Sequence, residues 1–369
     1  MRELTPTAEQ EELRSAVRAV LTRHEGAAAW RPLTEQIGVA GLAVPEEYGG
    51  AGCGPREVHV VMEELGRALS PVPFLGSAVL AVQALLASGD TAACKALLPR
   101  LAEGRAVGTL VWAEGGSWDP SAIRTAAAPG PAGTWQLTGT KEYVLDGATA
   151  GVMLVAARTG AGVSLFQVAT DGAGVRREAS VTMDETRSLA RVVLDRAEGR
   201  LLGTDGDGGR ILGRVLDVAC TALAAEQVGA AERCLELTVA YAKDRVQFGR
   251  PIGSFQAVKH RLADAYVLVE SARSAALGAA FAAGGTPEAT RSAAVAKSVC
   301  SEAFSAVAAE MIQLHGGIGI TWEHNAHRYF KRAHATAHLF GPPTWHRSRL
   351  ATDLGLELPG PGLQRTSSP

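Results

Sequence analysis

The feature that most constrains this chain is the order of its hydrophobic patterns, which change from helical to strand-like and back again. From Thr7 to about Val107, apolar residues recur at the three-to-four residue spacing of helices, as in EELRSAVRAVLTRH. After Gly108 the pattern becomes short β-branched or aromatic runs between turn residues, such as GTLVWAE and ARVVLDR. From about Gly208 long Ala-rich helical segments return, and we expect them at 211–244, 255–283 and 288–315.

These changes predict an α+β protein with three parts. Residues 1–107 are expected to form an N-terminal helical domain, and residues 108–207 a small antiparallel β-barrel or sandwich. Residues 208–355 are expected to form a C-terminal four-helix bundle. The segment 356–369, which is rich in Pro and Ser, is expected to be disordered. Such an order narrows the fold but does not define a function.

Charge and cysteine content exclude several classes of function. Lys and Arg total 36 against 38 Asp and Glu, so the chain lacks the basic excess of a nucleic-acid binder. The five cysteines are scattered and never form a C-x-x-C pair, which signals neither a disulfide framework nor a zinc site. The N-terminus is charged and has no apolar export signal. Together with the lack of a disulfide pattern, this predicts a cytoplasmic location for the protein. The uncharged stretch 68–89 is interrupted by Pro71 and Pro73, so we expect a buried helix there and no membrane association.

One motif lies at the end of the first long helical segment of the C-terminal part. It spans residues 241–264 and begins YAKDRVQFGRPIG, so glycines and a proline break the helix just after Arg245 and Gln247. A guanidinium offers a fork of donors to phosphate oxygens, and glycines let a backbone approach closely. The same residues are compatible with an arginine paired to a carboxylate at a helix C-terminus.

A second motif follows the helical segment 288–315. It reads QLHGGIGITWEH from Gln313 to His324 and places three glycines within four positions: Gly316, Gly317 and Gly319. Such a cluster permits backbone contact with a flat or phosphorylated ligand, although alone it is typical of a helix C-cap and turn.

Together the two motifs and the order of the parts resemble the acyl-CoA dehydrogenase family, in particular FadE-like flavoproteins of actinobacteria. The resemblance implies the cofactor FAD, with Arg245, Gln247 and Phe248 touching an FAD held mainly by a neighbouring subunit. It assigns Gln313, Gly316, Gly317 and Gly319 to the adenine and pyrophosphate end of that cofactor. It also implies a homo- or hetero-oligomer (a dimer or tetramer), an acyl-CoA or other acyl thioester as substrate, and an electron-transfer flavoprotein as electron acceptor.

The segments that meet the flavin ring in this family differ here. The first family segment, T-E-P-x-A-G-S-D, corresponds to residues 112–120, where Ala113 replaces a threonine. In the later strand, Tyr143 takes the aromatic position and Leu145 replaces a second threonine that normally hydrogen-bonds the flavin. Each polar group on the edge of a buried flavin ring that lacks a hydrogen bond weakens flavin binding by about 1–3 kcal/mol. We therefore expect a weak or differently arranged pocket for the flavin ring. Tyr143 fits either a flavin contact or an ordinary strand aromatic.

The catalytic base of the family is also missing. Dehydrogenation removes an α-proton from a thioester, and many members place the glutamate that takes it in a Y-E-G-T segment. Aligning residues 338–347 with that segment puts Phe340 on the tyrosine and Gly341 on the glutamate. In other members the base lies on the helix before the arginine motif, and that position falls at Ala219.

The remaining acid and imidazole side chains offer weak substitutes for this base. Glu226 lies two helical turns from Ala219, about 10 Å away, and an ion pair with arginine is the alternative role for it. Asp217 and Glu323 are less suitable, because they fall on another helix face and within the glycine segment, respectively. His338 and His346 flank Gly341 and titrate near neutral pH, although packing or surface roles are common for histidine. No H-E-x-x-H spacing occurs, so we expect no metal.

Three functions therefore remain open for a flavoprotein of this kind. The chain is itself an acyl-CoA dehydrogenase with an unrecognised base, or it is a catalytically degenerate subunit that shares FAD with a partner in a heteromeric dehydrogenase. The third is altered flavin chemistry, such as oxygenation or cyclisation, which needs no α-proton base. A non-enzymatic binding role without flavin is the outlying alternative.

Overall fold

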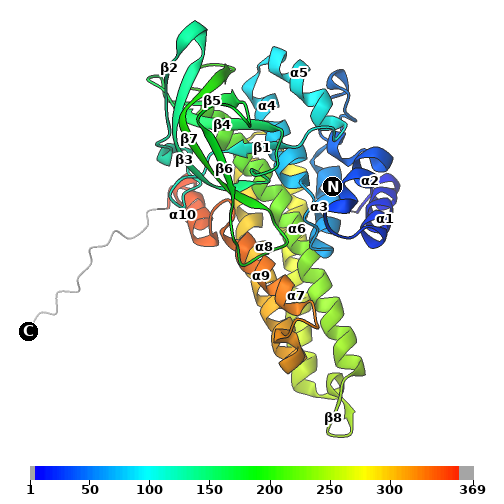
Figure 1. Ribbon diagram of the computed structural model, residues 1–369. Helices are drawn as coiled ribbons and strands as arrows, with labels where there is room; N and C mark the ends of the chain where they lie inside the picture. Colours follow the sequence, from blue (N-terminus) through cyan, green and yellow to red (C-terminus); the bar gives the residue numbers. More distant parts are fainter. Residues whose placement is uncertain (1–4, 357–369) are drawn as a thin grey trace, which may run out of the picture.

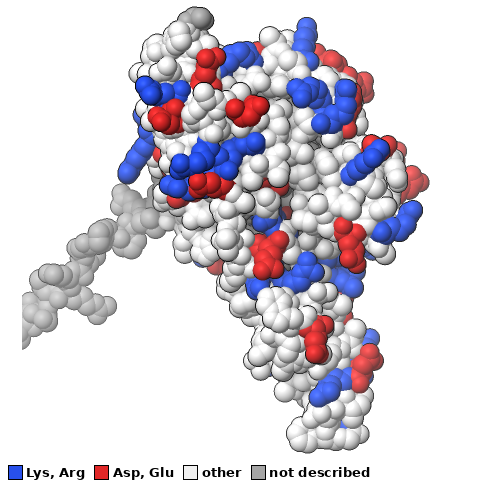
Figure 2. Space-filling model, viewed as in Figure 1, with Lys and Arg blue, Asp and Glu red and all other residues white. Residues whose placement is uncertain are grey.

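The computed structural model describes residues 5–356. Figure 1 shows a β-barrel at one end, a group of short helices beside it and a long helical bundle that extends away from both. Apart from Leu356, the tail that we expected to be disordered lies outside the described residues. In Figure 2 charged side chains of both signs are interspersed over the visible face.

The N-terminal part of the chain consists of helices, some of which begin at recognisable caps. They are α1 (Ala8–Arg23), α2 (Trp30–Pro32), α3 (Pro55–Arg67), α4 (Val82–Ser88) and α5 (Thr91–Ala102), and a π-helical segment, Phe74–Ala81, leads into α4. Thr7 and Gln10 form a capping box at the start of α1, and the side chain of Asp90 accepts a hydrogen bond from Ala93 at the start of α5.

Seven strands form the middle of the chain. They are β1 (Gly108–Val111), β2 (Ala126–Pro129), β3 (Trp135–Leu145), β4 (Val152–Arg158), β5 (Val163–Val168), β6 (Val175–Ala179) and β7 (Leu189–Leu202). Pairings in the order β4, β5, β7, β3, β2 and back to β4 close the sheet into a barrel, with β6 added on β7. Closure removes free strand edges, which resolves the choice between barrel and sandwich.

Most strand pairings of the barrel are antiparallel as expected, but two are parallel. Strand β4 pairs in parallel with β1, where Gly108 faces Val152, and also with β2 at a single position. Parallel neighbours need a long crossover, and here β2 and β3 lie between β1 and β4 in the chain. The hydrophobic pattern within each strand does not indicate which other strand it pairs with.

Long helices form the C-terminal bundle. They are α6 (Gly208–Asp244), α7 (Gln256–Ala282), α8 (Pro287–His315), α9 (Ala326–His338) and the short α10 (Pro343–Asp353). A small hairpin, β8 (Val246–Gln247) and β9 (Arg250–Pro251), connects α6 to α7. The first three helices lie within a few residues of the expected segments 211–244, 255–283 and 288–315, because periodicity and glycine stops are local signals.

Helices α3 and α6 cross at very short distance. A Cβ added to Gly66 of α3 would lie 2.0 Å from the carbonyl oxygen of Glu226, and one added to Gly229 of α6 would lie 2.0 Å from that of Glu63. Only glycine permits this approach. The largest hydrophobic core accordingly includes residues of the N-terminal helices, the barrel and α6, for example Leu85, Leu154 and Leu223.

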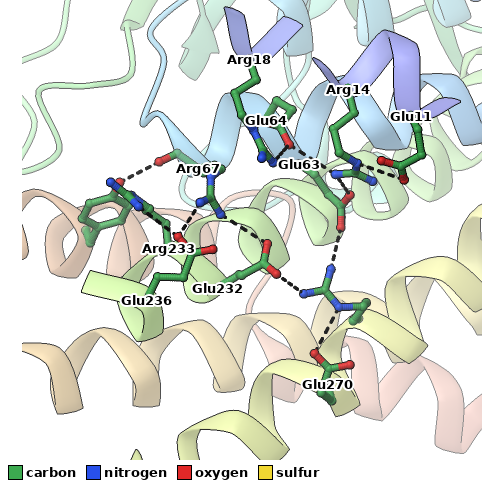
Figure 3. Close-up of polar contacts among 12 residues, drawn as sticks. Glu11, Arg14, Arg18, Glu63, Glu64, Arg67, Glu232, Arg233, Glu236 and Glu270 are labelled. Carbon is green, nitrogen blue, oxygen red and sulfur yellow. Dashed lines mark hydrogen bonds and ion pairs between the residues drawn. The ribbon is translucent and has the colours of Figure 1, made fainter. Parts of the chain in front are cut away.

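A network of ion pairs surrounds this crossing and ties α1 and α7 to it (Figure 3). Arg14 of α1 lies 2.7 Å from the carboxylate of Glu63, and Arg18 hydrogen-bonds Glu64 at 2.7 Å with two of its nitrogens. Arg273 of α7 contacts Glu63 at 3.4 Å and Glu232 at 2.7 Å. Burial raises the pKa of Glu63, but contacts with His59 and Arg14 outweigh it and bring the pKa to about 2. This carboxylate is therefore ionised at neutral pH.

Candidate functional site

The arginine motif forms a hairpin at the tip of the bundle, at the far end from the barrel (Figure 1). Arg245 caps α6, and its carbonyl accepts a hydrogen bond from the Ile252 amide at 2.8 Å. Phe248 and Gly249 form the two-residue turn with φ values of 52° and 78°, the combination of a type I′ hairpin. Arg245 and Gln247 are exposed, and the Phe248 side chain is 91% exposed. A strained turn thus presents one cation and one aromatic ring outward.

The glycine motif lies at the same end of the bundle. Helix α8 ends at His315, whose backbone oxygen accepts a hydrogen bond from the Tyr241 hydroxyl at 3.3 Å. The rings of these two residues stack with centroids 4.3 Å apart. Tyr241 lies in the last turn of α6, four residues before Arg245, so the fold brings the two motifs together.

The glycine turn leaves space for a ligand. A Cβ added to Gly316 or Gly317 would meet nothing within 4 Å, whereas one added to Gly319 would lie 2.9 Å from a carbonyl oxygen of α8. Gln313 is exposed beside the turn. His315 is buried, its Nδ1 lies 2.7 Å from the Met311 oxygen, and its Nε2 has no hydrogen-bond partner among the described residues. Burial lowers its pKa, which leaves a neutral ring with an acceptor nitrogen beside the turn.

Tyr143 is not part of this group. It lies on β3 in the barrel, and Figure 1 places β3 and the hairpin at opposite ends of the molecule. The side chain is 46% exposed, its φ is 53°, and its ring centroid lies 6.2 Å from that of Trp118. The residues expected to bind FAD therefore form two separate groups in one chain.

Aromatic side chains fill the region beside Tyr143. Trp112 and Phe340 stack with centroids 5.9 Å apart, and Trp118 packs edge-on against both at 5.1 Å. Ala113 and Leu145, which replace the family threonines, are buried in the same hydrophobic core. No side-chain hydroxyl is available at these two positions for the polar edge of a flavin ring.

The structure leaves no room for a side chain at Gly341, the residue that we expect at the position of the family glutamate. Gly341 has a φ of 100°, and a Cβ added there would lie 2.3 Å from the ring of Trp345. His346 is fully buried, its Nε2 lies 2.9 Å from the Phe340 oxygen, and burial lowers its pKa to about 3. His338 is exposed at the end of α9. Space for a carboxylate is thus lacking at Gly341, and the His346 ring is buried, while His338 stays accessible to solvent.

Glu226 is held by two arginines that the sequence analysis did not identify. Arg187 contacts both of its carboxylate oxygens, at 2.5 and 2.6 Å, and Arg332 contacts one at 3.2 Å. Both arginines are buried, and they come from the loop before β7 and from α9. No spacing rule would have found them, because they lie 39 and 106 positions from Glu226.

The other two carboxylates considered as bases lie elsewhere. Asp217 accepts a hydrogen bond from Thr290 at 2.6 Å, and Glu323 is exposed. Within residues 5–356 there is no group of three or more His, Cys, Asp or Glu side chains that could hold a metal ion. Over the same residues, every helix is too short or too polar to cross a lipid bilayer.

The order of a helical layer, a β-barrel and a long helical bundle, with an exposed arginine hairpin and an open glycine turn at the bundle tip, fits a class of FAD-dependent oxidoreductases. The chain matches the family models described as "Acyl-CoA dehydrogenase, N-terminal domain" over residues 7–105 and "Acyl-CoA dehydrogenase, C-terminal domain" over residues 206–355. It belongs to the acyl-CoA dehydrogenase family, whose members are oxidoreductases that use FAD.

Relatives and solved structures support this assignment. The chain is 43% identical to acyl-CoA dehydrogenase IpdE2 of Mycolicibacterium smegmatis, over 94% of this chain and 99% of that protein. Among solved structures, the ChsE4-ChsE5 complex from Mycobacterium tuberculosis contains a chain with 31% identity and a TM-score of 0.86, covering 96% of this chain and 100% of that one. A variant of the Tcur3481-Tcur3483 steroid ACAD gives 34% identity and a TM-score of 0.84, with 94% and 98% coverage.

Proposed function

We propose that this chain is a subunit of a heteromeric acyl-CoA dehydrogenase, which shares FAD with a partner chain. The complex removes two hydrogens across the Cα–Cβ bond of an acyl-CoA or other acyl thioester and passes the electrons to an electron-transfer flavoprotein. In this proposal the chain supplies a binding half-site, and the partner supplies the ring pocket and the base.

The observation that carries the proposal is the contrast between the two ends of the molecule. At the bundle tip, Arg245 is exposed and the turn at Gly316 and Gly317 opens to free space. At the other end, the aromatic rings of Trp112, Trp118 and Phe340 pack against one another. The first group fits the diphosphate end of FAD, and the second does not fit its ring.

Each residue at the tip has a role that follows from its chemistry. The Arg245 guanidinium offers paired donors to phosphate oxygens, and the Gln247 amide adds a neutral donor. The glycine turn allows main-chain amides to approach the same ligand without steric hindrance. Phe248 offers an exposed ring that would lose its contact with water in a subunit interface.

The partner is required for proton removal. Bound FAD supplies the hydride acceptor, so the protein must supply a base for the α-proton. Trp345 occupies the space at Gly341, and two arginines neutralise Glu226, which leaves this chain without a free carboxylate at either place. Two of the similar structures are described as two-component complexes, ChsE4-ChsE5 and Tcur3481-Tcur3483.

Co-purification tests the proposal. The chain would be produced alone and together with an acyl-CoA dehydrogenase homologue encoded beside it, and the flavin absorption band would be measured for each preparation. We expect colourless protein from the chain alone and a yellow complex that an acyl-CoA bleaches. Stoichiometric flavin in the isolated chain, bleached by an acyl-CoA, would instead show a self-sufficient dehydrogenase.

A further inference from the structure

A cavity of about 100 Å³ lies where the N-terminal helices meet α6, and none of its lining residues belongs to either group described above. Its walls come from α3, the π-helical segment before α4, α6 and the end of α7. Most of the lining is apolar, for example Val58, Val79, Val218 and Ala222. Small-molecule sites commonly combine such walls with a few polar groups.

His59 of α3 supplies an unsatisfied polar group in this lining. Its side chain is 3% exposed, and neither ring nitrogen has a hydrogen-bond partner among the described residues. The carboxylate of Glu63 lies 3.6 Å from Nε2, which is within ion-pair range but beyond hydrogen-bond distance. A buried polar group without a hydrogen bond lowers the stability of the folded protein by about 1–3 kcal/mol. We therefore expect a ligand or a water molecule to hydrogen-bond the His59 ring.

Water accounts for only part of this environment. His59 also lines a second cavity of about 20 Å³ that it shares with the polar side chains of Gln10 and Arg14. A space of that size holds about one water molecule with polar partners. The larger cavity is lined by alanine and valine residues together with the polar side chains of Gln83 and Thr221, so it combines mostly apolar walls with a few hydrogen-bonding groups.

We propose that the larger cavity is a binding site for a small, neutral, hydrocarbon-like molecule that carries one hydroxyl or carbonyl oxygen. The apolar walls bind the hydrocarbon part, and His59 hydrogen-bonds the oxygen. An anion is disfavoured because the ionised Glu63 lies beside the ring. This site does not depend on the proposed sharing of FAD, because it uses none of the residues at the bundle tip.

A cysteine in the lining of the cavity can report whether the cavity is occupied. Cys53 lines the cavity and is partly exposed, whereas Cys94, Cys220, Cys234 and Cys300 are buried. Ellman's reagent should therefore modify Cys53 first in the folded protein. A molecule in the cavity should slow this reaction in proportion to the occupied fraction.

The test uses two probes of equal size, cyclopentanol and benzene, on the full chain with any subunit that co-purifies. Ligand-observed NMR would give each dissociation constant, and the Ellman reaction would report occupancy at Cys53. We expect cyclopentanol to bind with a dissociation constant in about the millimolar range, because it has only six non-hydrogen atoms. Bound cyclopentanol should protect Cys53 from Ellman's reagent.

Two variants separate the polar contact from the cavity itself. His59→Phe should weaken cyclopentanol binding about tenfold and leave benzene binding nearly unchanged, which also shows that the cavity persists. Ala222→Leu should fill the cavity and abolish binding of both probes. Cyclopentanol binding that is unchanged in His59→Phe would overturn the proposal. If neither probe binds or protects Cys53, the cavity holds only water and the proposal is also overturned.

Discussion

Lys297 is a cation held in the bundle by neutral partners. Its Nζ donates to the Ser301 hydroxyl and to the Ala337 carbonyl, each at 3.0 Å, and its side chain is fully buried. Burial lowers its pKa to about 8 from the usual 10.5. Within the bundle this residue joins α8 to α9 at the cost of burying a charge.

We expect the free energy of unfolding to rise with pH between about 8 and 10.5 because of Lys297. In that range the unfolded chain binds more protons than the folded one, so raising the pH favours folding. Urea unfolding at several pH values would measure the slope, and Lys297→Met should reduce it. The exposed Lys243→Met is the control, and an equal slope in both variants would contradict this assignment.

Gly341 has a backbone conformation and a close neighbour that both favour glycine. We expect Gly341→Ala to lower the free energy of unfolding by at least about 1–3 kcal/mol, because φ is 100° and the added carbon meets Trp345. Chemical unfolding of the variant and of the wild-type protein would measure this difference in the free energy of unfolding. Gly213→Ala, in the second turn of α6 with nothing within 4 Å, should instead be neutral or stabilising by about 1 kcal/mol. Equal effects of the two variants would contradict the packing described here.

At the scale of elements, Glu226 joins three of them. It lies on α6, and its two arginines come from the loop before β7 and from α9. Asp184 in that loop contacts Arg332 at 3.1 Å, which extends the cluster. An ion cluster of this kind positions the loop against the bundle.

Glu226→Gln distinguishes this positioning role from catalysis. Leaving buried arginines without their carboxylate should lower the free energy of unfolding by about 3–5 kcal/mol. Turnover of the folded complex, measured well below the unfolding temperature, should stay near the wild-type rate. Wild-type stability combined with lost turnover would instead identify Glu226 as the base. Asp217→Asn on the same helix serves as a matched control for loss of a carboxylate.

For the whole molecule, the proposed function depends on a cofactor that bridges two chains. We expect Arg245→Lys to weaken FAD binding by the complex about 10- to 100-fold, because an ammonium cannot reproduce paired donors to a diphosphate. Fluorescence titration of the flavin-free complex would measure it.

The matched control is Arg250→Lys in the same hairpin. Its guanidinium lies 4.1 Å from the centre of the Phe255 ring, where it interacts with the aromatic face. FAD affinity should change little in this variant. Equal losses in both variants would indicate a general effect of hairpin charge and would contradict a specific role for Arg245.

The sequence alone was sufficient for features that depend on neighbouring residues. Helical and strand periodicity, the glycine stops and the two motifs are local, so the order of helices, barrel and bundle and the family resemblance followed from them. The sequence also predicts that Ala113, Leu145 and Gly341 stand where the family has other residues.

Tertiary structure decided what depends on residues far apart in the chain. It pairs β1 with β4 in parallel, places Trp345 in the space at Gly341, and surrounds Glu226 with Arg187 and Arg332. It also leaves both ring nitrogens of His59 without a hydrogen bond to the described residues, beside a cavity. The physical reason is that packing, desolvation and ion pairing act between surfaces, and no spacing along the chain specifies which surfaces meet.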